Sequence, residues 1–244
     1  VHPEETRVVV VDSSTNRVSD FDVETTTKPQ IKGNIYLAKV IRVEPSLQAA
    51  FVDYGTGKNG FLPFSEIHPD YYQVTPEQKK KLIELAHANI VDDDEDPDDE
   101  ADEVAEYDDS NAGEDNKEFL KRAREFKIQD VIKTKQILLI QGVKEERGQK
   151  GASMTTYLSL AGRFAVLMPN SRKRNSYGIS KKISDKAERA RLREILHGLK
   201  IPKGMTVVLR TAAAGASGED ITKDYEYLTA LWNDIRKTTL ESVA

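Results

Sequence analysis

The sequence contains no cysteine, only four histidines and no long apolar run. The lack of cysteine excludes disulfides, thiolate metal ligands and a cysteine nucleophile within these 244 residues. The histidines do not occur at the spacing of a metal motif such as HExxH, so their pattern does not indicate a metal centre. The longest apolar runs, such as Ile137–Ile140 and Ala165–Met168, fall far short of the roughly 20 residues that a transmembrane helix needs. With no secretory signal at the start, we expect a soluble, cytoplasmic protein.

Acidic and basic residues are unevenly distributed along the chain. The whole sequence carries 36 Lys and Arg against 41 Asp and Glu, a formal net charge of −5. Residues 92–115 hold 15 of the acids and no Lys or Arg. The other 220 residues therefore carry 36 basic and 26 acidic side chains, a net charge of +10. A basic excess of this size indicates a polyanionic partner.

Strand signals divide the first 161 residues into two parts. Arg7–Asp12 is a β-branched run and Arg17–Thr25 alternates, which predicts a hairpin in a small unit at residues 1–29. This unit is too small for its own core, so we expect it to pack on something else. Residues 30–161 contain five short strand signals with a helical interruption, the pattern of an OB-type β-barrel. The expected strands are Ile35–Val43, Gln48–Tyr54, Asn59–Phe64, Thr134–Val143 and Ser153–Ala161.

The interruption lies between the third and fourth strands, at about residues 66–130. Pro76–Ile90 predicts one helix, and Asn116–Phe126 predicts a second one rich in Lys and Arg. Between them, the acidic stretch 92–115 is too poor in apolar residues to fold and is expected to be disordered. We expect the barrel to tolerate such an insertion because it leaves through a surface loop.

The last third, residues 162–244, alternates strand and helix signals. The expected elements are a strand at Phe164–Met168, a loop over 171–178, a helix at Asp185–Leu199, a strand at Thr206–Thr211 and a helix at Ile221–Leu240. Ser217, with Asp220 three residues later, is the expected N-cap of the last helix. The chain is therefore predicted to be of the α+β class, an OB-type barrel with a helical and acidic insertion joined to an α/β domain.

Two phenylalanines are candidates for contacts with nucleic-acid bases. In the second strand, Asp53 is unsuited to a barrel interior, which by alternation puts Phe51 and Ala49 on the outer face. The same alternation puts Phe61 on the outer face of the third strand. Two outward aromatic rings on adjacent strands form a platform on which bases stack, at about 1–3 kcal/mol per contact. The alternative is that both rings pack under the inserted helices.

Positive charge gathers in two further stretches. The turn between the fourth and fifth strands carries Lys144, Arg147 and Lys150, which in an OB fold flank the binding face, although hairpin tips are often charged for solubility alone. Residues 172–210 hold 12 Lys and Arg against three acids. Arg210 ends an apolar strand and precedes a hydroxyl, Thr211, and a small-residue loop that leads to a helix N-terminus. Guanidinium, hydroxyl and free backbone N–H groups together suit a phosphate pocket; an arginine that braces the loop is the alternative.

Several long motifs occur in an order that resembles one known family. They are GNIYLAKVIRVEPSLQAAFVDYG, GFLP, KEERGQKGASMTTYLSLAG, VLMPN, GISKKI and VLRTAAAGAS. Together they resemble the amino-terminal half of the bacterial ribonuclease E and ribonuclease G family, from about Arg7 to the end apart from the insertion. The resemblance implies a ribonuclease H-like fragment at 1–29 and an OB-type RNA-binding domain at 30–161. It also implies a 5′ sensor domain at 162–244 that recognises a 5′-monophosphate on single-stranded RNA.

The resemblance also implies site residues. The implied RNA contacts of the OB domain are Phe51, Phe61 and Lys150. The implied 5′-phosphate contacts are the side chains of Arg210 and Thr211, the backbone amide of Gly162, the apolar Val166 under the first base and the cation Lys181. Periodicity alone predicts a core position for Val166. Lys181 stands where the family usually has arginine, and it keeps the charge without the bidentate fork.

Catalysis is implied to lie outside this segment. In the family, a later domain cleaves RNA with Mg²⁺, and a zinc link joins protomers of a homotetramer that belongs to an RNA-degrading complex. We therefore expect no catalytic residue, metal site or cofactor in residues 1–244, which would recognise the substrate of an endoribonuclease of RNA processing and decay. One alternative is a stand-alone RNA-binding module without catalysis. Another is a fragment that docks a partner through the acidic insertion. For that insertion, a solubilising loop is a simpler interpretation than partner docking or repulsion of RNA.

Overall fold

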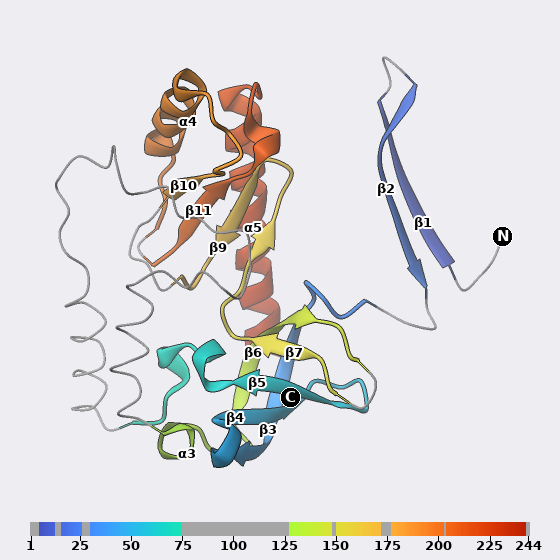
Figure 1. Cartoon of the computed structure of the whole chain (residues 1–244), viewed down its shortest axis with the longest axis vertical. Coiled ribbons are helices and arrows are strands. Elements are labelled where there is room, and N and C mark those ends of the chain that lie inside the picture. The colour runs from blue at the N-terminus through green and yellow to red at the C-terminus, as the bar shows by residue number, and fades with distance from the viewer. Residues whose placement is uncertain are drawn as a thin grey trace.

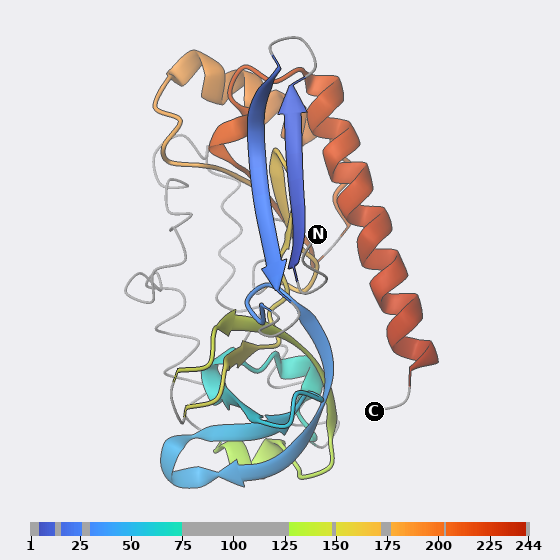
Figure 2. The ribbon, with the colours of Figure 1, turned by 90° about the vertical axis from the view of Figure 1, so that its right-hand side faces the viewer.

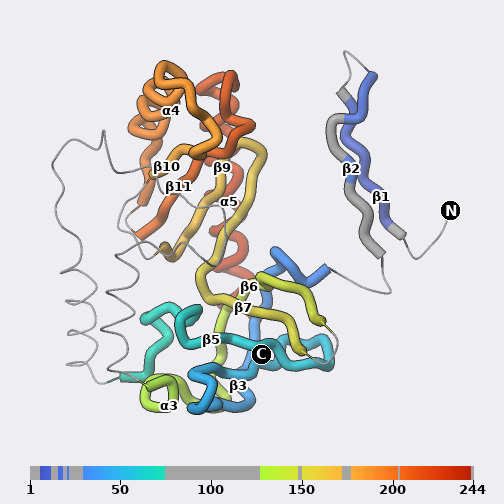
Figure 3. Tube along the Cα trace, viewed as in Figure 1, coloured from blue at the N-terminus to red at the C-terminus, as the bar shows by residue number. Residues whose placement is uncertain are grey.

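The computed structural model describes residues 5–12, 16–25, 30–74, 127–147, 150–171, 177–202 and 204–242. The helices expected at 76–90 and 116–126 and the acidic stretch 92–115 lie outside the described residues and stay predictions. The described residues form a two-stranded hairpin, a closed barrel and a four-stranded sheet with helices (Figure 1). Their order along the chain can be followed in Figure 3.

The hairpin pairs β1 (Glu5–Asp12) with β2 (Arg17–Thr25) in antiparallel register, as predicted. Figure 1 shows it standing apart from the barrel and from the larger sheet. The apolar side chains that the structure describes in it are exposed, with Val8 at 55% and Phe21 at 57% of full accessibility. The packing expected for this unit is therefore not seen within the described part of the chain, and its ribonuclease H-like character stays a prediction.

Five strands close the barrel in the order β3-β4-β5-β7-β6, which confirms the predicted OB-type architecture. They are β3 (Ile35–Glu44), β4 (Ala49–Asp53), β5 (Asn59–Pro63), β6 (Ile137–Lys144) and β7 (Ser153–Thr155). Neighbouring strands are antiparallel except β5 and β7, which pair in parallel. Short helical segments follow the strands: η1 (Pro45–Leu47), η2 (Phe64–Glu66), η3 (Pro69–Tyr71) and α3 (Ile128–Val131).

The barrel core is filled by alternate residues of these strands, as the period of two requires. Val40, Val52, Leu62 and Leu138 are at most 1% exposed. Gly60 provides the space for Met154, because a Cβ there would lie 2.8 Å from the methionine side chain. The outer face of the same strands is therefore left for binding.

The expected strand Ser153–Ala161 is wrong as a single element. β7 ends at Thr155, and Leu160–Ala161 forms β8 in the other sheet. The reason is local: the hydroxyl of Thr155 donates to the carboxylate of Glu66 at 2.6 Å, and that of Thr156 donates to the Glu66 carbonyl at 2.8 Å. Threonine side chains that bond in this way compete with the strand ladder.

The second sheet has the order β10-β11-β9-β8. Its further strands are β9 (Ala165–Met168), β10 (Tyr177–Ile179) and β11 (Thr206–Leu209), followed by the short η4 (Thr211–Ala213). Only β10 and β11 are parallel among these described strands. The predicted loop over 171–178 is wrong at its end, because Tyr177 and Gly178 pair with Val207 and Val208.

Two helices complete this α/β domain, both close to their predicted bounds. Helix α4 (Lys186–Gly198) is capped by Asp185, and α5 (Gly218–Glu241) by Ser217. Buried leucines and isoleucines of both helices share one core with β9 and β11, including Leu192, Leu196, Ile221 and Leu228. Figure 2 shows α5 running along one side of the molecule, from the level of the sheet toward that of the barrel. None of the helices in the described ranges has the length and apolarity needed to cross a membrane.

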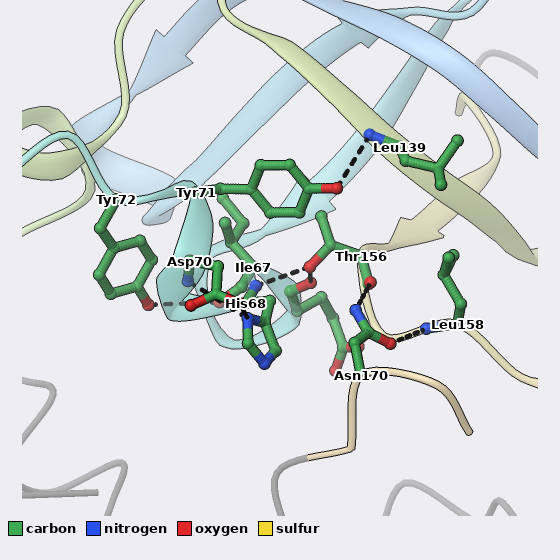
Figure 4. Close-up of polar contacts among 10 residues, drawn as sticks. Ile67, His68, Asp70, Tyr71, Tyr72, Leu139, Thr156, Leu158 and Asn170 are labelled. Atoms are coloured by element: carbon green, nitrogen blue, oxygen red, sulfur yellow. Dashed lines mark hydrogen bonds and ion pairs between the residues drawn. The ribbon is translucent and has the colours of Figure 1, made fainter. Parts of the chain in front are cut away.

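Hydrogen bonds join the barrel to the second sheet (Figure 4). Asn170, after β9, donates from its side-chain amide to the Thr156 carbonyl at 2.7 Å and accepts from the Leu158 N–H at 2.9 Å. In β6, the buried side chain of Gln141 donates to the Ser159 carbonyl at 2.9 Å and accepts from the Ser159 N–H at 2.8 Å. The connection between the two units is therefore held from both sides.

Candidate functional site

Phe51 of β4 and Phe61 of β5 lie directly opposite each other across the two strands. Their ring centroids are 5.9 Å apart and their planes meet at 64°, an edge-to-face contact. Both side chains are half-buried and lie outside the barrel core, so their predicted outward position is confirmed. Ala49 is fully buried but, like the two phenylalanines, is absent from the barrel core, so burial does not contradict its predicted outward position. We call Phe51 and Phe61 the aromatic platform; the alternative packing against the inserted helices concerns residues outside the described ranges.

A β-bulge brings a cation to the aromatic platform. In β3, Val40 opposes Val52, but the next paired residue is Arg42 opposite Phe51, and Ile41 is the extra residue. Strict alternation from the buried Val40 would turn residue 42 inward, whereas the bulge shifts the register by one and turns it outward. The guanidinium carbon of Arg42 lies 4.7 Å from the ring centroid of Phe51, a cation–π contact. Alternation alone misses Arg42 because the bulge has no clear sequence signal.

The turn between β6 and β7 is fixed by its two acids. The carboxylate of Glu145 accepts the N–H groups of residues 31–32 at 2.8 Å each. Glu146 accepts the Tyr54 hydroxyl at 2.9 Å and pairs with Lys58 at 2.6 Å, and burial raises the pKa of Tyr54. Since both acids are bonded to the barrel, the turn presents cations at its surface. The exposed cations of the turn are Lys144, Arg147 and Lys150.

The predicted phosphate contacts gather at one edge of the second sheet. Parallel β10 and β11 place Ile179 opposite Leu209, so the chain leaves both strands at the same edge. Lys181 and Arg210 follow there, and both are exposed. The Arg210 guanidinium donates from Nη1 to the carbonyl oxygen of Gly162 at 2.5 Å. We call Gly162, Lys181, Arg210 and Thr211 the edge cluster; it joins three separate stretches of the sequence.

Val166 lies beside this cluster but not in the core. It is half-buried in β9, opposite Val208 and Ala161. Its neighbours Ala165 and Leu167 are fully buried on the face that α5 covers. The core position expected from periodicity is therefore wrong, because the sheet has one covered face and Val166 points to the other.

The loop after Arg210 offers fewer free N–H groups than the sequence suggests. Its N–H groups at Ala213, Ala214 and Ala216 bond to backbone carbonyls. At the start of α5, Ser217 accepts the Asp220 N–H at 3.1 Å, which confirms the predicted cap. Turn and cap bonds therefore use part of the loop N–H groups, and the predicted phosphate pocket stays a prediction. The side chains of Arg210 and Thr211 are the better candidates.

Two acids that the sequence analysis did not predict as important hold backbone segments next to the edge cluster. Asp224 of α5 accepts the N–H groups of three consecutive residues, at 3.1, 2.9 and 2.9 Å. The residues that donate to it are Arg163, Phe164 and Ala165. Glu188 of α4 accepts the Gly215 N–H at 2.8 Å and two hydrogen bonds from Arg191, at 2.6 and 2.9 Å. In a sequence, acids on amphipathic helices look like ordinary surface charges, which is why neither was predicted.

Hydrogen bonds lower the pKa of Glu188. The Arg191 side chain first, and then the Gly215 N–H, lower the pKa of Glu188 from 4.5 to about 2. Glu188 therefore stays ionised below pH 4.5, where an ordinary glutamate becomes protonated, and it is bonded to the loop that follows Thr211. Among the described residues, no group of three or more His, Asp or Glu side chains is arranged to hold a metal ion.

The structure thus shows two candidate surfaces, the aromatic platform on the barrel and the edge cluster on the second sheet. Residues 30–98 match the S1 RNA binding domain, and residues 159–244 match the Ribonuclease E/G family. Fold and sequence together define an S1-type RNA-binding barrel joined to a ribonuclease-associated α/β domain. Through this α/β domain the chain matches the ribonuclease E/G family.

Curated relatives agree with this family. Ribonuclease E of Buchnera aphidicola subsp. Schizaphis graminum is 35% identical over 99% of this chain, and Ribonuclease E of Escherichia coli (strain K12) is 37% identical over 96%. Ribonuclease G of Escherichia coli (strain K12) is 31% identical over 96% of this chain. The chain spans 20%, 17% and 38% of the lengths of these three relatives.

Proposed function

We propose that this chain binds single-stranded RNA and recognises a 5′-monophosphate at the end of that strand. It would thereby serve as the substrate-recognition part of an endoribonuclease of RNA processing and decay. The observation that carries the proposal is the edge cluster, in which Arg210, Thr211 and Lys181 are exposed. Arg210 is bonded to the carbonyl of Gly162, whose own N–H donates to the Ala165 carbonyl at 2.8 Å and is therefore not the free amide that the resemblance implies. The S1 barrel with its outward aromatic platform supports the choice of RNA as the polyanion.

The aromatic platform suits bases of any identity. Stacking uses the ring faces that all bases have, so Phe51 and Phe61 give affinity with little sequence preference. Arg42 adds a positive charge beside Phe51, and the turn 144–150 adds further cations for the RNA backbone. This surface is therefore expected to bind RNA with a 5′-monophosphate and RNA with a 5′-hydroxyl end equally well.

The edge cluster suits a small terminal anion. One nitrogen of the Arg210 guanidinium is held by the Gly162 carbonyl, which leaves its other donors for a phosphate. The Thr211 hydroxyl follows directly in the chain, and Lys181 contributes a second positive charge at the same edge. A 5′-hydroxyl end carries no charge for these groups, so we expect it to bind less tightly.

Hydrolysis and assembly are proposed from the family resemblance alone. On that basis, cleavage uses Mg²⁺ and assembly uses Zn²⁺, both bound outside residues 1–244. The whole protein would act as a homotetramer within an RNA-degrading complex of the cytoplasm. No step of the hydrolysis is assigned to a side chain of this segment.

The proposal is tested by comparing one short single-stranded RNA with a 5′-monophosphate or a 5′-hydroxyl end. Wild type should bind the monophosphate more tightly, and Arg210→Ala should lose most of that preference while still binding the 5′-hydroxyl RNA. Arg210→Lys should keep part of it, because it retains charge but not the planar fork. No preference in wild type, or full preference in Arg210→Ala, would refute 5′-monophosphate recognition at this site.

A further inference from the structure

Asp224 lies against Gly162 of the edge cluster, but its carboxylate is bonded to backbone N–H groups. Its two carboxylate oxygens accept three consecutive backbone N–H groups from the turn 162–165, at 2.9 to 3.1 Å. Hydrogen bonds from three N–H groups stabilise a carboxylate and direct its lone pairs away from other partners. Asp224 is therefore bonded to the protein and is not placed to contact an anionic ligand.

The turn that Asp224 holds is also the turn that holds Arg210. The Gly162 carbonyl accepts the Arg210 guanidinium at 2.5 Å, and the Phe164 carbonyl accepts the Arg210 backbone N–H at 2.8 Å. The turn therefore bonds to both the main chain and the side chain of Arg210. A shift of this turn would move the guanidinium relative to Thr211 and Lys181.

Gly162 and Asp224 fit each other closely. A Cβ on residue 162 would lie 2.5 and 2.6 Å from the two carboxylate oxygens of Asp224, closer than real Cβ contacts. The carboxylate can approach the three N–H groups only because residue 162 has no side chain. Glycine at 162 and the acid at 224 thus form one structural unit.

We propose that Asp224 is a positioning residue of the 5′-phosphate site, an inference that rests on the proposed function. From α5, it fixes the turn 162–165, and the turn fixes the Arg210 guanidinium that receives the phosphate. Asp224 itself makes no contact with RNA. Its loss should therefore reduce the preference for 5′-monophosphate RNA without weakening binding at the aromatic platform.

The first test compares Asp224→Ala and Asp224→Asn with Asp234→Asn, a control that removes one exposed acid from the same helix. The ratio of affinities for 5′-monophosphate and 5′-hydroxyl RNA should fall about tenfold or more in Asp224→Ala, since small misplacements of a binding group are costly. Asn retains one acceptor oxygen, so Asp224→Asn should lose less. The control should keep the wild-type ratio. If Asp224→Ala fails to fold, Asp224→Asn decides, and an unchanged ratio in it overturns the inference.

A double-mutant cycle tests the fit of Gly162 to Asp224. Gly162→Ala should reduce the 5′-monophosphate preference in wild type, because its Cβ displaces the carboxylate. In the Asp224→Ala background the same change should have little further effect, so the two losses are not additive. Additive losses would show that the two residues act separately.

The outcomes separate this inference from the proposed function. If wild type does not prefer 5′-monophosphate RNA, the proposed function fails before any variant is considered. If wild type and Arg210→Ala behave as proposed but both Asp224 variants keep the preference, only the positioning role fails. Thermal unfolding and binding of 5′-hydroxyl RNA show whether each variant is folded. A variant that loses both RNAs equally indicates a general structural role and also overturns the inference.

Discussion

Phe51 and Phe61 face outward as a simple consequence of strand geometry. Val52 and Leu62 fill the barrel, so their neighbours must face outward, and cross-strand pairing puts the two rings in contact. A ring held by its neighbour loses little freedom when a base stacks on it. This arrangement makes the contribution of a single ring measurable.

Phe51→Ala should weaken single-stranded RNA binding by about 1–3 kcal/mol, or about 5- to 150-fold. The loss should be the same for 5′-monophosphate and 5′-hydroxyl RNA, because stacking on the barrel does not involve the strand end. Titration of labelled RNA at fixed salt measures both affinities. Tyr227→Ala removes an exposed aromatic ring from α5 and serves as the control. A loss confined to the 5′-monophosphate RNA would contradict the assignment of Phe51 to the platform.

Arg42 allows a second test, based on salt. If it meets an RNA phosphate, Arg42→Ala should lower the slope of log affinity against log salt by about 0.7, the value for one contact with a single strand. Arg42→Lys should keep the slope but lose affinity, because a lysine stacks less well on Phe51. Lys237→Ala, an exposed cation on α5, is the control. An unchanged slope in Arg42→Ala would mean that Arg42 only supports the ring.

These residues show what could be predicted from the sequence and what could not. Strand alternation was enough to place Phe51 and Phe61, because it depends only on the nearest neighbours. Arg42 depends on a bulge at Ile41, and Asp224 depends on hydrogen bonds to residues about 60 positions away. Neither the bulge nor contacts at this sequence separation can be derived from local patterns.

Helix α4 and the loop after η4 are joined by one carboxylate. Glu188 bonds within its helix to Arg191 and across to the N–H of Gly215, where the backbone has a positive φ of 74°. The bond from Gly215 to Glu188 ties the loop after η4 to helix α4 and so keeps this loop close to the sheet edge. The edge cluster therefore depends on both helices, α4 through Glu188 and α5 through Asp224.

The lowered pKa of Glu188 predicts a pH effect on stability. Its folded-state pKa of about 2 lies below the ordinary 4.5, so its contribution is fully present above about pH 4.5 and is lost as the pH falls toward 2. Glu188→Gln should be less stable than wild type at neutral pH, and the difference should shrink over this range. Thermal unfolding of both proteins at several pH values measures it, with Glu194→Gln as a control for charge on the same helix. A difference that stays constant from pH 7 to about 2 would contradict the prediction.

Most elements follow from patterns along the chain, and the exceptions have a physical reason. Helix α5 was predictable because its apolar period and its Ser217 cap agree. The strand expected at Ser153–Ala161 was not, because Thr155 and Thr156 bond to Glu66, almost 90 residues earlier. The two ends of that segment form β7 and β8, which belong to different sheets. Strand propensity does not indicate which sheet a strand will join.

The barrel and the α/β domain are expected to unfold together, because Asn170 and Gln141 hold the segment that connects them. Asn170→Ala removes the partners of the Thr156 carbonyl and the Leu158 N–H and should cost about 1–3 kcal/mol. Denaturation can be followed by fluorescence of Trp232, in α5, and by circular dichroism of the whole molecule. The two transitions should coincide in wild type and separate in Asn170→Ala. Gln73→Ala, at an exposed position, should leave them coincident.

The charge of the whole molecule gives the last prediction. Residues 92–115 change the formal net charge from +10 to −5, so they should repel RNA from a basic surface. Deleting them should tighten binding at low salt, and the gain should shrink as the Debye length falls from about 30 Å at 0.01 M to about 8 Å at 0.15 M salt. A segment of equal length with Asn and Gln in place of the acids should reproduce the gain, since it removes charge but not length. The ratio between 5′-monophosphate and 5′-hydroxyl RNA should stay the same, because long-range repulsion acts on the whole strand and the edge cluster acts on its end.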